Sequence, residues 1–133
     1  MKGFKVTTVG IPVQESRHTF NGATGITSAD VGKAVTLVTQ GADNTVKLAG
    51  VDDPILGVIE AVEVETSGEI TVGVTIMGGY RLPCATNATI KVGDTVVGAG
   101  AGLVKKGAAS TDLRFVVTEA STIPEGFVGV LKL

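Results

Sequence analysis

The sequence is poor in the residues on which most catalytic and metal sites depend. It contains one histidine (His18), one cysteine (Cys84) and no tryptophan among 133 residues. A single cysteine excludes an internal disulfide, and no ligand spacing around these two residues indicates a zinc site. Any Ser-His-Asp or Cys-His mechanism would have to use His18, which lies in a polar stretch outside the expected core. We therefore expect no catalytic residues, no metal and no cofactor, and we interpret the protein as a non-enzyme.

Strong charge of one sign and long apolar runs are also missing. The net charge is −2 and aromatic residues make up 4% of the chain. A nucleic-acid binder usually shows a basic face and aromatic side chains for base stacking, so we expect no direct nucleic-acid partner. No apolar run approaches the length of a membrane span, and the stretch MKGFKVTTVGIPV lacks the unbroken apolar region of a signal peptide. We expect neither a membrane partner nor secretion.

The sequence is rich in valine and glycine, and it contains 19 glycines. From residue 28 onward, short apolar runs of β-branched residues alternate with turn-forming Gly, Asp and Asn, and no window carries a convincing helical period. A single helical turn is predicted at Ser28 and another near Ser110, where Ser or Thr precedes Asp. The cleanest alternation predicts a central strand whose core residues are Ile70, Val72, Val74 and Ile76. Residues 28–133 are therefore predicted to form one all-β domain, a small barrel or sandwich.

Residues 1–27 differ from the rest. Spaced apolar residues come first, interrupted by Pro12, which bars a central strand position. A polar stretch without a clear period, QESRHTFNGATG, follows. We interpret the segment as an extended N-terminal arm that contacts a partner; one edge strand plus a long loop remains the alternative. The partner-binding residues predicted on it are Phe4, Val6, Val9, Ile11, Val13, Arg17, His18 and Phe20.

The stretch VGAGAGLVKKG, residues 97–107, could be a phosphate-binding loop or a hairpin. Leu103 stands where a dinucleotide loop needs its third glycine, and no Gly-Lys-Ser/Thr follows. A strand resumes after the glycines, whereas a phosphate loop leads into a helix. The pattern predicts a β-hairpin.

A faint internal echo supports this interpretation. The series DVGKAV, TVKLAG, ILGVIEA resembles the later series KVGDTV, LVKKGA, FVGVLKL, which suggests two similar hairpin units around one core. Three other candidates for chemistry have simpler interpretations. Asp52 and Asp53 are predicted turn residues, and Cys84 a small buried hydrophobe. Glu63 and Glu65 share a solvated strand face or meet a neighbouring subunit.

The segments DVGKAVTL, DNTVKLAG, DDPILGVIEA and VGDTVVGAGAGLVKKGA, with the final short strand, resemble the small capsid decoration, or cement, proteins of tailed bacteriophages. The resemblance covers about residues 26–133 and rests on turn-and-strand signatures. It implies a compact barrel-like or sandwich domain, β-tulip-like, that forms homotrimers. It also implies a virion protein made in the host cytoplasm, which binds the major capsid protein on the outer surface of the capsid and holds neighbouring capsomers together.

Two other classes remain open at this point. One is a trimeric all-β nucleotide-processing enzyme of the dUTPase type, whose site would form between subunits; nucleotide binding would support it. The other is a β-barrel tail or host-attachment component of a virion, which its location on the tail would reveal. The resemblance transfers no catalytic residues.

Overall fold

The structure is a computed structural model that describes residues 16–86, 88–107, 114–121 and 126–133. These residues are nearly all in β-strands and turns, which confirms the predicted all-β class. A single turn of 3-10 helix, η2 (Ser28–Asp30), begins where the sequence predicted one. The strands are β1 (Ser16–Gly22), β2 (Ala34–Leu37), β3 (Thr45–Leu48), β4 (Gly57–Val64), β5 (Ile70–Pro83), β6 (Val96–Gly100), β7 (Leu103–Lys106), β8 (Phe115–Glu119) and β9 (Phe127–Lys132).

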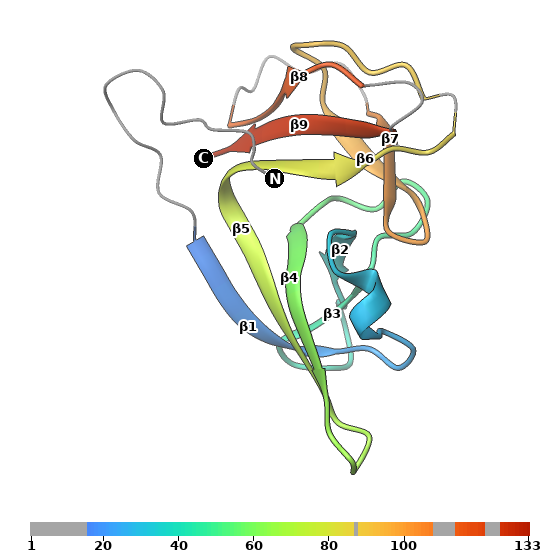
Figure 1. The fold of residues 1–133 in the computed structure, drawn as a ribbon, viewed down its shortest axis with the longest axis vertical. Helices are drawn as coiled ribbons and strands as arrows, with labels where there is room; N and C mark the ends of the chain where they lie inside the picture. Colours follow the sequence, from blue (N-terminus) through green and yellow to red (C-terminus); the bar gives the residue numbers. More distant parts are fainter. Residues whose placement is uncertain (1–15, 87, 108–113, 122–125) are drawn as a thin grey trace.

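Strands β1 to β5 close into a five-strand barrel, which forms the lower half of Figure 1. The order around it is β1-β3-β2-β4-β5, and β5 returns to pair with β1. All neighbours are antiparallel except β1 and β3, which run parallel with Gly22 opposite Val46. A closed sheet of this kind leaves no long free edge in the barrel.

The barrel interior is filled by β-branched side chains that alternate along the strands. On β5, Val72 and Val74 are fully buried, and Ile70 and Ile76 pack against the same cluster while half-buried. This confirms the predicted central strand and its inward face. Each buried valine contributes about 1.5 to 3 kcal/mol relative to an exposed one, so the alternation specifies the register of the whole barrel.

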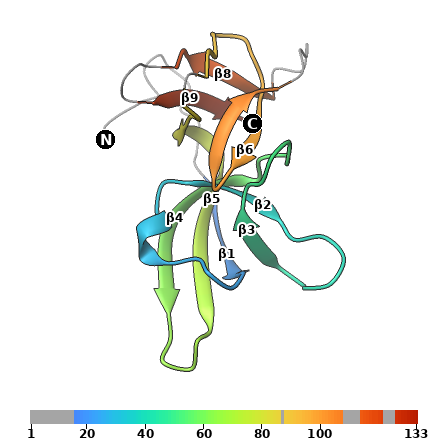
Figure 2. The same cartoon turned by 90° about the vertical axis from the view of Figure 1, so that its right-hand side faces the viewer.

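A second group of strands, named the second ring, forms the upper half of Figures 1 and 2 and repeats several pairings of the barrel. Strand β5 bends at Gly78, whose φ is 108°, and its second half pairs with β9, which pairs with β8. The β6–β7 hairpin meets the end of β5 through a parallel bridge between Cys84 and Val104. This bridge takes the place of the parallel β1–β3 pairing in the barrel. The second half of β5 and strands β6 to β9 thus repeat the arrangement of β1 to β5.

Matching hydrogen bonds show how closely the two units correspond. In the barrel, Gly32 donates its N–H to the carbonyl of Ile59 at 2.8 Å; in the second ring, Gly93 donates to Val117 at 2.8 Å. Both glycines follow a valine and have a φ of 94°. The Val-Gly turns of DVGKAV and KVGDTV therefore have the same structural role. One leads the chain into β2 and the other leads it toward β6.

The β-bulges also correspond. In the barrel the register shifts between Ile59 and Ala61, which places Ala61 opposite Gly73; in the second ring a shift after Val117 places Glu119 opposite Gly129. The sequence echo is therefore corrected in its last part. FVGVLK of β9 corresponds to TVGVTI of β5, not to ILGVIEA of β4, because the paired bulges fix the register.

The glycine stretch joins the two units. Strands β6 and β7 form the predicted hairpin, and Ala101 and Gly102 at its turn both have positive φ, 55° and 79°, as a two-residue hairpin turn of type I′ requires. Gly102 donates its N–H to the Ala49 carbonyl at 3.1 Å and accepts the N–H of Ala34 at 2.9 Å. The stretch is thus a packing surface against the barrel rather than an open loop.

Around this hairpin a second apolar core fills the space between the rings. It includes Ala34 and Ala49 of the barrel together with Leu82, Val104 and Val130 of the second ring, all fully buried. At one edge the ammonium of Lys132 donates to the carbonyls of Ile55 and Leu56, and burial lowers its pKa. The units are therefore fixed to each other by a shared strand and a shared core.

Replacing Val74 with Asp is expected to unfold the protein. The carboxylate would lie in the barrel core without a partner, at a cost of about 4 kcal/mol or more. Thr19→Asp, on the exposed face of β1, should change the free energy of unfolding by about 0.5 kcal/mol or less. Thermal melts followed by circular dichroism measure both; a cooperatively melting Val74→Asp variant would contradict the assigned core.

Gly98→Ala is expected to destabilise the protein by about 1 to 3 kcal/mol, because its Cβ would collide with the carbonyl oxygen of Gly50. Gly73→Ala is the matched control. A Cβ there would meet only Arg17 Cδ at 3.8 Å and Ala61 Cβ at 3.9 Å, which is ordinary contact distance. Chemical denaturation should separate the two variants clearly, and equal midpoints would show that the hairpin does not pack as described.

Candidate functional site on the outer face of β1, β5 and β4

The predicted partner-binding residues fall into two groups. Arg17, His18 and Phe20 lie on β1. The other five lie outside the described residues, namely Phe4, Val6, Val9, Ile11 and Val13.

Strand β1 corrects the extent of the predicted arm. From Arg17 to Asn21 it pairs with β5 residue by residue, and its end pairs with β3, so β1 closes the barrel. The chain is therefore part of the domain from Ser16 onward, and the predicted arm over 1–27 is too long at its C-terminal end. The predicted edge strand is also replaced by a strand with partners on both sides. Residues 1–15 lie outside the part of the chain that the structure describes.

The three β1 residues have different surroundings. Phe20 is half-buried and packs against the barrel core, so its ring stabilises the fold, and its predicted partner contact stays a prediction. Arg17 and His18 are exposed. The guanidinium of Arg17 lies 3.6 Å from the carboxylate of Glu60, which the bulge in β4 turns toward the outside.

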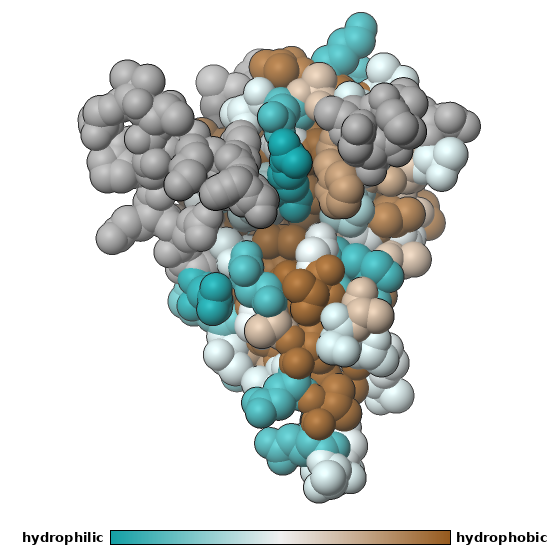
Figure 3. Space-filling model, viewed as in Figure 1, coloured by the Kyte–Doolittle hydropathy of each residue, from teal (hydrophilic) through white to brown (hydrophobic). Residues whose placement is uncertain are grey.

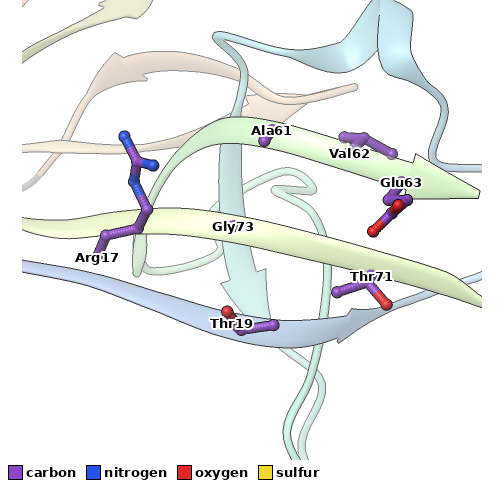
Figure 4. Close-up of a pocket in the computed structure, with 7 residues that line it drawn as sticks. All are labelled: Arg17, Thr19, Ala61, Val62, Glu63, Thr71 and Gly73. Atoms are coloured by element: carbon purple, nitrogen blue, oxygen red, sulfur yellow. The ribbon is translucent and has the colours of Figure 1, made fainter.

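A shallow hollow lies on the outer face beside Arg17 (Figure 4). Its volume is about 460 Å³, and Gly73 forms its floor on the central strand β5. Gly73 pairs with Thr19 on one side and Ala61 on the other, both small, and this explains the hollow. Its lining consists of Arg17, Thr19, Ala61, Val62, Glu63, Thr71 and Gly73.

The charges around the hollow are unequal. Arg17 forms an ion pair with Glu60, whereas Glu63 forms no ion pair with another described residue. Glu65 and Glu69 follow on the same β4–β5 hairpin, and all three of these glutamates are exposed. Glu63 and Glu65 are therefore exposed in the single chain, as both predicted alternatives, a solvated face and a contact with a neighbouring subunit, require. The hollow presents two hydroxyls, one guanidinium and one carboxylate, and the further glutamates lie beside it, so negative charge is in excess around the hollow rather than within its lining.

Other titratable groups serve the fold. Cys84 is buried, which confirms its prediction as a small hydrophobe, and burial raises the pKa of its thiol. The backbone N–H of Thr27 and the ammonium of Lys33 hold the pKa of Asp30 below its usual value, as expected for a carboxylate in a capping box. Asp53 accepts the N–H of Gly50 at 2.9 Å, confirming the predicted turn. Within the described ranges, no cluster of His, Cys, Asp and Glu could hold a metal ion.

Exposed apolar side chains form a second feature of the surface. A hydrophobic stripe runs down the region of β4 and the lower half of β5 in Figure 3. Val64, the last residue of β4, is 54% exposed. Met77 and Leu133 are also exposed, at 42% and 57%. Met77 stands opposite Ser16, and the next residue, Gly78, stands opposite Lys132, which precedes Leu133 in the chain. Sequence reasoning missed this pair because it depends on cross-strand register.

No helix of the residues that the structure places is long and apolar enough to cross a membrane.

Phe20→Ala is expected to lower the free energy of unfolding by about 2 kcal/mol, less than the loss of a fully buried ring would cost. The matched control is Thr19→Ala, the exposed neighbour on β1, which should leave stability within about 0.5 kcal/mol of the original. Urea denaturation measures both variants. Unchanged stability in Phe20→Ala would show that the ring does not support the barrel core.

Searches of protein-family models, of curated proteins and of solved structures each found no match to this chain.

Proposed function

We propose that the protein is a capsid decoration protein, which binds the outer surface of an icosahedral phage head as a homotrimer and stabilises the contacts between capsomers. Its partner is the major capsid protein, and its place is the virion surface. The observation that carries the proposal, beside the resemblance in the sequence, is the exposed pair Met77 and Leu133 at the point where residues 1–15 join the barrel.

This placement suits attachment to a shell. Ser16 opens β1 at the junction of the two units, and Figure 1 shows the C-terminus on the same side of the molecule. Fifteen residues reach up to about 50 Å when extended, at about 3.3 Å each. That length would let the N-terminal segment contact a neighbouring capsid subunit while Met77 and Leu133 bury apolar surface beside it.

The rigid body suits the same role. Two rings that share β5 and a common core resist relative motion, so a force applied at one ring is transmitted to the other. Three copies in a trimer present three such bodies and three N-terminal segments. Weak contacts engaged together give a much higher effective affinity than one contact alone.

Deleting residues 2–14 is expected to leave the melting temperature nearly unchanged and to weaken attachment to expanded capsids strongly, because β1 and the cores are retained. Met77→Ser should also weaken attachment. Sedimentation of labelled protein with capsids measures binding, and light scattering measures the trimer.

Val92→Ser is the matched control, since Val92 is 66% exposed but lies away from Ser16 in the second ring. It should bind capsids as the original does. Full binding by the truncated protein and by Met77→Ser would contradict the proposal, as would a protein that binds no capsid. Measurable nucleotide binding would favour the dUTPase-like alternative, and location on the tail the host-attachment one.

A further inference from the structure

The outer face of the second ring carries an ion pair above a glycine. Arg81 of β5 and Glu119 of β8 both stand opposite Gly129 of β9, one on each side. Their charged groups approach to 3.4 Å, and both side chains remain nearly half exposed, at 47% and 44%. Strand β9 lies between β5 and β8, and because Gly129 has no side chain, no side chain of β9 separates Arg81 from Glu119 at this position.

The hollow in the barrel occupies the corresponding place. There the central glycine is Gly73, and the flanking residues are Thr19 and Ala61. Thr19 and Ala61 occupy the positions that correspond to Arg81 and Glu119 in the second ring, because the β-bulges of the two units match. Because Thr19 and Ala61 have short side chains, the hollow in Figure 4 lies over Gly73, bordered by the side chain of Arg17, whose Cδ lies 3.8 Å from the position of a Cβ on Gly73.

The hollow offers one carboxylate to an added cation. Glu63 lines the hollow and stands opposite Thr71, two residue pairs away from Gly73. Arg17 also lines the hollow, and its guanidinium lies 3.6 Å from the carboxylate of Glu60, so this exposed pair offsets part of its repulsion of a second cation. The site therefore keeps a carboxylate acceptor, and the hydroxyls of Thr19 and Thr71 add neutral acceptors beside it.

We propose that the hollow over Gly73 binds an arginine side chain of a partner protein, in the position that Arg81 occupies over Gly129 in the second ring. A planar guanidinium fits a flat floor with acceptors around it, whereas the ammonium of lysine is a single strongly hydrated point charge. The identity of the partner rests on the proposed function: it is the major capsid protein, with an arginine on its outer surface.

The first test uses the full-length, ¹⁵N-labelled protein and two probes, N-acetyl-arginine amide and N-acetyl-lysine amide, at equal ionic strength. The arginine probe should shift the backbone amides of Thr19, Ala61, Thr71 and Gly73, with binding at least about threefold tighter than that of the lysine probe. No localised shift with arginine, or equal binding of both probes, would overturn the proposal.

Two variants test the site itself. Glu63→Gln should weaken binding of the arginine probe about threefold, while Glu65→Gln removes an equal charge from the same hairpin outside the hollow and should have little effect. Equal effects of the two would show attraction to the hairpin's charge alone and overturn the site.

The double variant Thr19→Arg/Ala61→Glu rebuilds the ion pair of the second ring inside the hollow. It should fold, as a thermal melt shows, and lose the arginine-dependent shifts; retained shifts at Thr71 and Gly73 in a folded double variant would place binding elsewhere. Capsid sedimentation of the same variants separates the two proposals. If the protein binds the arginine probe but not capsids, the arginine site is supported and the capsid protein is excluded as its partner. If the protein binds capsids but not the arginine probe, the proposed function is supported and the arginine site is excluded.

Discussion

Strand β5 pairs with other strands along its whole length, on both edges in its first half, and the rest of the molecule depends on this pairing. Its first half lies between β4 and β1 and buries Val72 and Val74 in the barrel; its second half pairs with β9 and buries Leu82 in the second core. The bend at Gly78 lets one continuous strand serve both rings. A single strand in two sheets removes the hinge that separate domains would have, so the surfaces of the two units keep a fixed relation.

Much of the fold follows from local sequence. The alternation from Ile70 to Ile76 has the period of a strand with one buried face, and positive φ at Ala101 and Gly102 explains the hairpin that the glycine pattern predicted. Strand β1 was not predicted as a barrel strand because QESRHTFNG is polar. It is held in place chiefly by backbone hydrogen bonds, with Phe20 packing on the core, and such bonds leave little trace in a pattern of side chains.

The candidate site was beyond sequence reasoning for a related reason. Thr19, Gly73 and Ala61 are far apart in the chain, and only the register of three strands brings them together. A one-residue bulge at Glu60 decides which β4 side chains face outward, and a shift of one residue would turn the face inward. The same bulge explains why the echo matched β9 to the wrong strand. Arg17 was predicted as a partner contact on an N-terminal arm. In the structure it lies on β1, where it borders the hollow.

The sharing of β5 has a consequence for how such a chain could have arisen and could change. If one ancestral ring was duplicated in tandem, the two copies are not separate domains. The last strand of the first copy is also the first strand of the second. The barrel of β1 to β5 closes without the second ring, whereas the second ring needs the second half of β5, and a gene fragment encoding either unit alone lacks the core between Ala34, Ala49 and Val104 that both supply. The outward-facing positions beside the two matched glycines already differ, with Arg81 and Glu119 in one copy and Thr19 and Ala61 in the other.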